Sequence, residues 1–500
     1  MGLHLGVVMT ARRACPPAAG PLEEYAASFD GLFASLAQRR GFREYLTGLL
    51  LPRERNKTLT ALAGAEPVVG AQDPAVQRLQ FFLSEAHWDA ERVNDHRLEL
   101  LAADPVTAAH EGGVLVVDDS GDRKDGHATA HVARQYLGSV GKTDNGIVVV
   151  STLWADERVY YPLHVHAYTP AGRLPAGSHD PGFATKPRLA ADLVERAVTG
   201  GVPFAAVVAD NFYGPSQTDT LISALHDAGL PYVLALKPHV GFWAPERGAH
   251  TPVEAAQAVG WRSQRRPGGW HKVTRRLRDG HAETWWAADA TLGSWGPDQT
   301  IRLVVVSTDP GRLPKHTTWY LVTNRPRPDS PQAAEAGLAP AGLAEIVRCY
   351  GLRNWVEQGY KQVKHELGWA DFQVRGQTAI HRHYTLVCCA FSFCWRAGAV
   401  PASYPEPPPT ATTSGQRQHR LGRRERGDHH TVHIGQTSSD GLLAGRATPD
   451  PGLADPGHTA ATLLARLVQR APTSPAARPT HRRHHRPSDQ PLPPALTNHR

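Results

Sequence analysis

The spacing of hydrophobic residues changes twice along the chain. Between residues 22 and 110 they recur every three to four positions, as in the stretch from Glu23 to Ala37, and this period predicts helices. From Val114 to Ala167 the apolar residues instead form short β-branched runs separated by Gly, Asp and Asn, which predicts strands. Helical and strand-like segments then alternate as far as Leu236. This order predicts an α/β domain built on a mixed sheet.

A third pattern occupies residues 238–341. The region is rich in Trp and Arg and contains alternating runs, so we expect a β-rich insertion before helical spacing returns at residues 342–397. Its cations have two interpretations of equal weight. They form a surface for phosphate contacts with Trp side chains stacking on bases, or they lie outside a half-buried sheet with Trp inside. The cations concerned are Arg262, Arg265, Arg266, Lys272, Arg275 and Arg276.

Neither end of the chain carries these patterns. Residues 1–21 are interpreted as a disordered extension, because their brief apolar start precedes Arg12 and Arg13, the wrong order for a signal peptide. Residues 398–500 are rich in Pro, Arg, His, Ser and Thr and cannot bury enough apolar surface to offset the entropy of ordering. We expect a disordered low-complexity tail there, and its abrupt onset suggests a frameshifted C-terminus.

The formal net charge of +7 lies mainly in that tail, which holds 13 Arg, no Lys and 7 acidic residues. The rest of the chain is nearly neutral, so local patches rather than net charge would have to bind nucleic acid. One basic cluster in the helical region at residues 22–110 is either a DNA contact or a solvated rim. It consists of Arg39, Arg40, Arg43, Arg53, Arg55 and Lys57.

The cysteines and the hydropathy of the chain indicate the cellular compartment to expect. The five cysteines form no CxxC pair, which fits a reducing cytosol, so we expect a cytoplasmic location. No stretch approaches the roughly 18 apolar residues of a membrane-spanning helix, and we expect no membrane partner.

Four polar residues late in the folded part are the strongest candidates for chemistry. Tyr350, Arg353, Glu357 and Lys364 lie in a stretch without proline that predicts a helix. Their spacing would put all four on one stripe within roughly 60° of arc. One carboxylate flanked by two cations and a phenol is suited to holding a metal-bound phosphate. The alternative is a surface ion pair along the helix, such as Arg353 with Glu357.

Two further acidic residues, Asp118 and Asp210, each follow a β-branched run directly. Charged groups at strand ends can leave the core and meet a ligand, although Asp210 taken alone could equally cap the next helix. Asp119 competes with Asp118, because side chains alternate along a strand and only one of the two can face the site if the strand continues. Asp122 and Asp125 are interpreted as loop acids.

Three motifs, taken in their order along the chain, resemble one group of bacterial insertion-sequence transposases of the DDE superfamily. The motifs are the strand Gly113-Val-Leu-Val-Val-Asp118, the segment Val207-Val-Ala-Asp210-Asn-Phe-Tyr-Gly and the spacing Tyr-x2-Arg-x3-Glu-x6-Lys. The lead-in at residues 133–145 fits one branch of the group. The resemblance covers about residues 22–397. It implies a ribonuclease-H-like catalytic core in two parts, residues 111–237 and 342–397, with the insertion at 238–341 and a helical DNA-binding domain at 22–110.

The resemblance also implies the chemistry. Asp118, Asp210 and Glu357 would be catalytic and would hold Mg²⁺, with Mn²⁺ as the alternative ion. Asp118 is preferred to Asp119 because relatives keep the first acid. The residues expected to bind DNA are Tyr350, Arg353 and Lys364.

The implied substrates are double-stranded DNA at the transposon ends and in the target. Terminal inverted repeats would be cleaved by water, and the freed 3′-hydroxyl would attack the target. Relatives act on paired ends, so we expect a homodimer in a synaptic complex at the nucleoid. Two alternatives stay open here: an inactive remnant that binds DNA as a repressor, and a host repair nuclease on the same fold.

Overall fold

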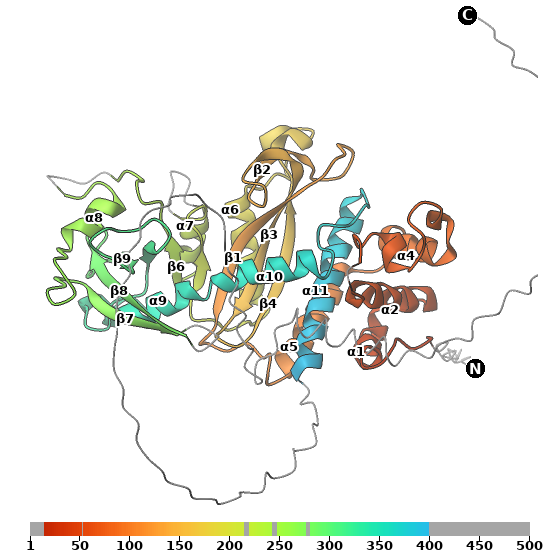
Figure 1. The fold of residues 1–500 in the computed structure, drawn as a ribbon, viewed down its shortest axis with the longest axis horizontal. Helices are drawn as coiled ribbons and strands as arrows, with labels where there is room; N and C mark the ends of the chain where they lie inside the picture. The colour runs from red at the N-terminus through yellow and green to blue at the C-terminus, as the bar shows by residue number, and fades with distance from the viewer. Residues whose placement is uncertain (1–14, 53, 215–219, 243–247, 277–280, 400–500) are drawn as a thin grey trace, which may run out of the picture.

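The computed structural model describes residues 15–399 apart from 53, 215–219, 243–247 and 277–280 (Figure 1). All but the first two residues of the predicted tail, and most of the predicted N-terminal extension, lie outside the described residues. Within them, one sheet of ten strands forms the centre of the molecule. The strands are β1 (Val114–Arg123), β2 (Ala133–Leu137), β3 (Lys142–Ala155), β4 (Tyr160–Tyr168), β5 (Val207–Ala209), β6 (Tyr232–Ala235), β7 (His271–Arg276), β8 (Ala282–Ala290), β9 (Arg302–Ser307) and β10 (Thr318–Thr323).

The order of the strands confirms the predicted mixed sheet. Strand β3 pairs with β4 on one side and antiparallel with β1 on the other, and β1, β5 and β6 follow as parallel neighbours. This is the order expected of a ribonuclease-H-like core. Strand β2 pairs with the first residues of β3.

The β-rich insertion is also confirmed, and it continues the same sheet. Strand β10 pairs antiparallel with β6, and β9, β8 and β7 follow in order out to the edge. The insertion therefore lengthens the core sheet, at the left in Figure 1, instead of forming a separate unit.

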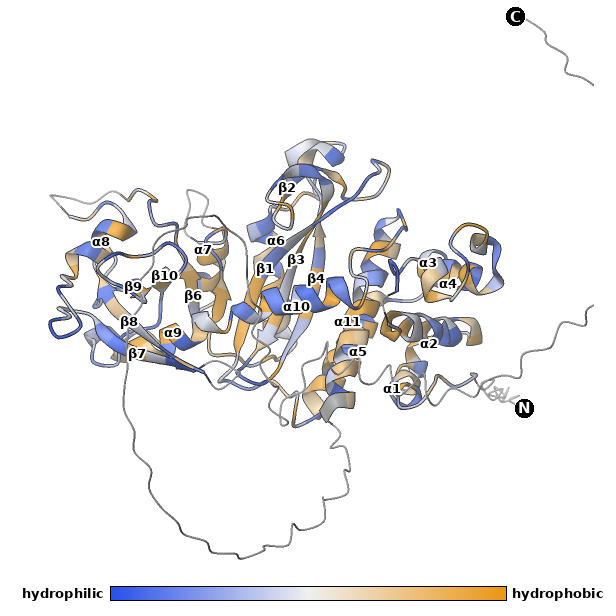
Figure 2. Ribbon diagram, in the orientation of Figure 1, coloured by the Kyte–Doolittle hydropathy of each residue, from blue (hydrophilic) through white to orange (hydrophobic). Residues whose placement is uncertain are grey.

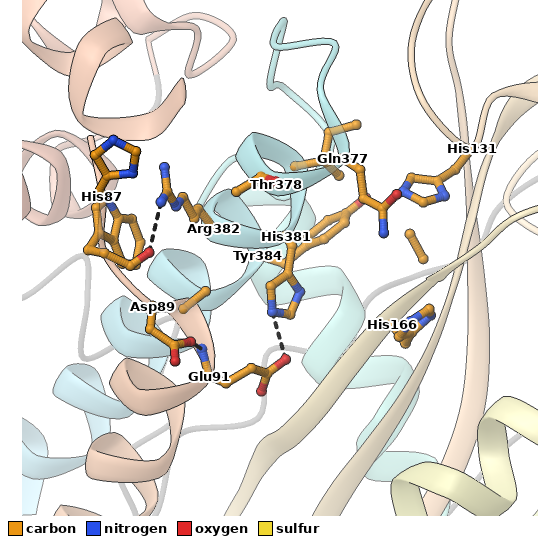
Figure 3. Close-up of a pocket in the computed structure, with 14 residues that line it drawn as sticks. His87, Asp89, Glu91, His131, His166, Gln377, Thr378, His381, Arg382 and Tyr384 are labelled. Carbon is orange, nitrogen blue, oxygen red and sulfur yellow. Dashed lines mark hydrogen bonds and ion pairs between the residues drawn. The ribbon is translucent and has the colours of Figure 1, made fainter. Parts of the chain in front are cut away.

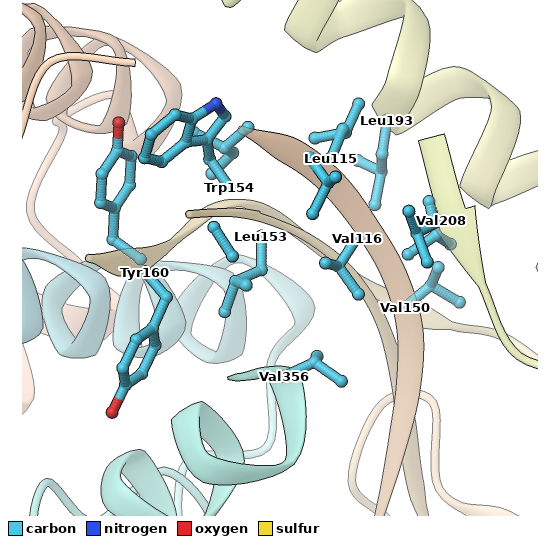
Figure 4. Packing of buried hydrophobic residues seen from close by; sticks show 14 of the residues in the cluster. Leu115, Val116, Val150, Leu153, Trp154, Tyr160, Leu193, Val208 and Val356 are labelled. Atoms are coloured by element: carbon cyan, nitrogen blue, oxygen red, sulfur yellow. The ribbon is translucent and has the colours of Figure 1, made fainter. Parts of the chain in front are cut away.

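Helices cover both faces of the central strands. Leu193 of α6 (Lys186–Thr199) packs on one face, and Val356 of α10 (Asn354–His365) lies on the other, with Val116 and Val150 of the sheet between them (Figure 4). The remaining α-helices of the described chain are α1 (Leu22–Ser28), α2 (Leu36–Leu50), α3 (Leu59–Leu62), α4 (Pro74–Ser84), α5 (Ala90–Ala103), α7 (Thr220–Asp227), α8 (Pro252–Ala258), α9 (Leu343–Gly351) and α11 (Gln377–Ala399).

The helices at residues 22–103 assemble around α11, which comes from the far end of the described chain. The hydroxyl of Tyr25 donates to the carbonyl of Cys389 at 3.1 Å, and Nη1 of Arg97 donates to Oγ of Ser392 at 2.9 Å. Figure 2 shows the apolar character of α11, in contrast to the mostly hydrophilic α10. The N-terminal helical region is thus confirmed, whereas the predicted domain boundaries stay predictions.

One helix boundary differs from the sequence pattern. The period from Glu23 to Ala37 predicted a continuous helix, but α1 ends at Ser28 and α2 begins at Leu36. The reason is a capping box, in which Oγ of Ser35 accepts from the backbone N–H of Gln38 while the Gln38 side chain accepts from the N–H of Ser35.

Candidate active site

Asp118 and Asp210 come together because their strands are parallel neighbours. Val117 of β1 pairs with Ala209 of β5, so each acid lies one residue beyond this pair. Strand β5 ends there, as predicted. Strand β1 does not: it continues through Asp118 to Arg123, because it remains paired with β3.

Arg353 joins these two acids to Glu357. Its Nη2 atom donates to Oδ2 of Asp118 at 3.3 Å and lies 3.9 Å from Oδ2 of Asp210. Its Nη1 atom lies 3.6 Å from Oε1 of Glu357, one helical turn along α10. Acids from two strands and a helix, far apart in the sequence, therefore surround one guanidinium.

Burial controls the protonation of these acids. Asp118 is only 8% exposed, and burial raises the pKa of its carboxyl to about 7 although Arg353 opposes the rise. Burial also raises the pKa of Asp210, while its Oδ1 accepts from the backbone N–H of Phe212 at 2.9 Å. The side chain of Glu357 is 57% exposed. The site therefore extends from the interior at Asp118 to the surface at Glu357.

Asp119 serves a different partner. Because β1 continues past Asp118, consecutive side chains point to opposite faces. Oδ2 of Asp119 pairs with Nζ of Lys186, the first residue of α6, at 2.6 Å. Of the two competing acids, the contact with Arg353 therefore favours Asp118 as the member of the site.

The predicted single helix from Tyr350 to Lys364 is interrupted. Helix α9 ends at Gly351 and α10 begins at Asn354. The junction is tightened by bonds that span three residues: the N–H of Arg353 donates to the carbonyl of Tyr350 at 3.1 Å, and that of Val356 to Arg353 at 3.0 Å. Glycine is a poor helix former, which accounts for the break at this point.

The four residues of the predicted stripe are consequently divided. Tyr350 lies on α9 and is mostly buried, which raises the pKa of its phenol to about 12. Its ring packs edge-to-face with that of Trp319, with the ring centroids 4.9 Å apart. Lys364 lies near the other end of α10. Its Nζ atom pairs with Oδ1 of Asp122 at 2.6 Å and donates to the carbonyl of Gly121 at 3.4 Å. Of the four, Arg353 contacts Asp118 and Asp210, and Glu357 joins them through Arg353.

Sequence reasoning missed two residues beside the site. Asp122, interpreted as a loop acid, is a buried residue of β1 that holds Lys364. Tyr360 donates from its hydroxyl to the carbonyl of Asp118 at 3.4 Å and shares a hydrogen bond of 2.7 Å with Ser151. The alternation Asp118-x-Ser-x-Asp122 and the three- and four-residue spacing along α10 were signals that could have identified both.

Three residues of the basic cluster near the N-terminus are buried, namely Arg39, Arg43 and Lys57, whereas Arg40 is exposed, Arg55 is half-buried and Arg53 lies outside the described residues. Arg43 is buried and pairs with Glu23 at 2.7 Å and Asp30 at 2.6 Å. Lys57 is also buried, and its Nζ atom donates to the carbonyls of Leu49 and Leu51. DNA binding by the domain at residues 22–110 stays a prediction, which the buried members of this cluster do not support.

The structural interpretation of the insertion holds for one of its cations, and the phosphate-contact interpretation stays a prediction for the others. The guanidinium carbon of Arg275 lies 4.9 and 4.7 Å from the ring centroids of Trp285 and Trp319, and these two rings also contact each other, with centroids 4.6 Å apart. Arg275 therefore belongs to the structural interpretation. The other cations of that set are exposed and remain candidates for phosphate contact: Arg262, Arg265, Arg266, Lys272 and Arg276.

The donor set fits a hard divalent cation, since all three acids offer carboxylate oxygens. In the described part of the chain, however, no three acidic, His or Cys side chains stand close enough together to hold an ion as they are. The three acids would need to draw together around a metal.

A cavity elsewhere is chemically different. It has a volume of about 710 Å³ and lies between α5, α11 and β4, where His131, His166 and His381 contribute to its lining (Figure 3). Nε2 of His381 pairs with Glu91 at 2.8 Å. None of the three acids around Arg353 lines this cavity, so the cavity is separate from the candidate site.

Comparison with known proteins gives the same assignment. A profile of the DDE superfamily endonucleases matches residues 29–291, more than half of the chain. The chain belongs to the DDE endonuclease superfamily. It is 31% identical over 370 residues to a probable transposase for insertion sequence element IS701 from Microchaete diplosiphon, covering 73% of this chain and 85% of that protein. The resemblance inferred from the motifs is confirmed.

Endonucleases of the DDE superfamily typically use divalent metals. In this DDE endonuclease, the profile match includes Asp118 and Asp210 but ends before Glu357. The inclusion of Glu357 in the candidate site therefore depends on its contact with Arg353. Among the described residues, no helix combines the length and apolar character needed to cross a membrane.

Proposed function

We propose that this DDE endonuclease is an insertion-sequence transposase. It binds the terminal inverted repeats of its element, cleaves the DNA at their ends and joins the freed ends to target DNA. Support comes above all from the convergence of Asp118, Asp210 and Glu357 on Arg353. The similarity to a probable insertion-sequence transposase supports the same function.

The proposed chemistry is an exchange at phosphorus. Water attacks the phosphodiester at the repeat boundary, and the departing oxygen becomes a free 3′-hydroxyl. That hydroxyl then attacks a target phosphodiester, so one P–O bond forms as another breaks and no covalent enzyme intermediate is needed. Asp118, Asp210 and Glu357 would hold Mg²⁺, with Mn²⁺ as the alternative. When bound, the ion stabilises negative charge on the attacking and leaving oxygens.

The remaining residues of the motif would position DNA. Arg353 and Lys364 supply cations for backbone phosphates, and Tyr350 lies beside Arg353 at the start of the junction. The exposed cations of the insertion offer further phosphate contacts. We include in the proposal a homodimer acting on paired ends in the cytoplasm, at the nucleoid.

The test is cleavage of a labelled duplex that carries the element's own terminal repeat, with Mg²⁺ present. Glu357→Ala should lower the cleavage rate by about a thousandfold, which corresponds to about 4 kcal/mol of lost transition-state stabilisation. Glu366→Ala is the matched control, because Glu366 is exposed and follows the end of the same helix. It should cleave at the wild-type rate.

Each other outcome has a definite meaning. Repeat-specific binding without cleavage by the wild-type protein would support an inactive DNA-binding remnant. Cleavage that survives Glu357→Ala would place the active site elsewhere.

A further inference from the structure

One guanidinium occupies the point at which the three acids converge. The contacts of Arg353 with Asp118, Asp210 and Glu357 span 3.3 to 3.9 Å. Nε of Arg353 is buried and has no hydrogen-bond partner within the described part of the chain. The position of this side chain therefore depends on the attraction of the carboxylates.

A metal ion would need the same oxygens. Mg²⁺ binds carboxylate oxygens at about 2.0–2.1 Å, and it would lie between the acids that Arg353 now separates. The atoms involved are Oδ2 of Asp118, Oδ2 of Asp210 and Oε1 of Glu357. The described residues contain no three-ligand group ready for an ion. The guanidinium and the ion therefore cannot share this space.

We propose that Arg353 is a built-in competitor of the metal. It compensates the charge of the three carboxylates in the metal-free protein, and it must turn away before they can hold an ion. A DNA phosphate is the natural new partner, because the guanidinium fork pairs with phosphate as it does with carboxylate. Metal and DNA would then each raise the affinity of the other by the same factor.

The surroundings of Arg353 allow this movement. It lies in the junction between α9 and α10, and its side chain is 16% exposed. Glu357 is the most exposed of its three partners, so the solvent-facing side of the site lies there. The assignment of the acids as metal ligands rests on the proposed function, whereas the competition is a separate claim.

The experiment is calorimetric titration of the full-length protein with Mn²⁺ in the absence of DNA. Arg353→Met should bind Mn²⁺ at least about tenfold more tightly than wild type, since a repelling charge and an occupying group are both removed. Arg353→Lys should fall between the two, because lysine keeps the charge but lacks the fork.

The matched control is Arg348→Met, which removes the same charge from α9. Arg348 pairs with Glu345 and Glu157, away from the three acids, so its loss should leave the affinity for Mn²⁺ unchanged. Adding Glu357→Gln to Arg353→Met should abolish the gain in affinity. Circular dichroism checks folding, and Arg353→Lys keeps the claim testable if Arg353→Met fails to fold.

The two proposals fail in different ways. If Mn²⁺ binding depends on Glu357 but Arg353→Met binds no more tightly than wild type, the competition is wrong and the proposed function stands. If Arg353→Lys binds as wild type does, charge alone acts, and the competition by occupancy is again wrong. Mn²⁺ binding that is independent of Glu357 in every variant would overturn both.

Discussion

Two adjacent aspartates differ in role because a strand turns alternate side chains to opposite faces. Asp118 faces Arg353 and the acidic site, and Asp119 faces Lys186 at the start of α6. Of these two neighbouring residues in β1, one is therefore a candidate metal ligand and the other forms an ion pair between the sheet and a helix.

This difference predicts unequal effects of two matched substitutions. Asp118→Asn should lower cleavage by about a thousandfold through loss of a metal ligand. Asp119→Asn should change cleavage by less than about tenfold and lower the free energy of unfolding by about 1 kcal/mol, because its ion pair is only partly buried. Single-turnover cleavage and urea unfolding measure the two quantities. Equal loss of cleavage in both variants would contradict the assignment of faces.

At the scale of single residues, the candidate site residues can be chosen from the sequence more readily than the partners that their side chains contact. Asp118, Asp210 and Glu357 could be chosen from their motifs, and the structure brings all three to one guanidinium. The burial of Arg43 could not be foreseen, because its partners come from α1 and the turn that follows. Spacing within one helix does not show which neighbour will neutralise a charge.

At the scale of elements, the insertion supports the junction between α9 and α10. Arg275 of β7 makes cation–π contacts with Trp285 and Trp319, and Trp319 in turn contacts Tyr350. A Cβ atom at Gly351 would lie 3.1 Å from the guanidinium of Arg275, so glycine permits this close approach. The strand-rich insertion is therefore connected by direct contacts to the segment that carries Arg353.

These contacts of Arg275 predict a long-range effect on activity. Arg275→Ala should lower the free energy of unfolding by about 1–2 kcal/mol through loss of two cation–π contacts. It should also slow cleavage, because the junction that holds Arg353 loses its support. Arg276→Ala, the exposed neighbour on the same strand, should change stability by less than about 0.5 kcal/mol. Urea unfolding would detect the contrast in stability, and cleavage assays would detect the slowing in Arg275→Ala. Similar losses of stability in both variants would argue against this role of Arg275.

The elements themselves were largely predictable, since the β-branched runs and the helical periods correspond to real strands and helices. The break after Gly351 was not. Glycine is a weak helix former, and its lack of a side chain also lets the guanidinium of Arg275, from a distant strand, approach closely, a contact that the local sequence does not reveal. The continuation of β1 past Asp118 likewise depends on pairing with β3, which the sequence of β1 does not reveal.

At the scale of the whole molecule, His383 connects three regions. Its Nδ1 atom shares a hydrogen bond of 2.8 Å with the hydroxyl of Tyr45 on α2, and its Nε2 atom lies 3.1 Å from the carbonyl of Gly368. Because the imidazole is completely buried, its pKa falls from 6.5 to about 3. The folded protein therefore requires it neutral.

This burial predicts acid sensitivity with a definite sign. Below about pH 6.5 the unfolded chain protonates His383 while the folded chain does not, so stability is lost as the pH falls toward about 3. The loss from this group should approach about 1.4 kcal/mol per pH unit. His383→Gln has no titrating group, so the difference in unfolding free energy between wild type and variant should shrink between pH 7 and pH 5. A constant difference in urea unfolding across that range would contradict the prediction.

The packing of α11 has a consequence for how the protein is made. The helices that emerge first from the ribosome lack the partner around which they assemble, because that partner lies at residues 377–399. The N-terminal bundle can close only after nearly all of the described chain has been translated. A truncated product that stopped short of α11 would leave apolar helix faces uncovered and invite aggregation or proteolysis. The N-terminal helices thus depend on the last helix of the described chain to bury their apolar faces.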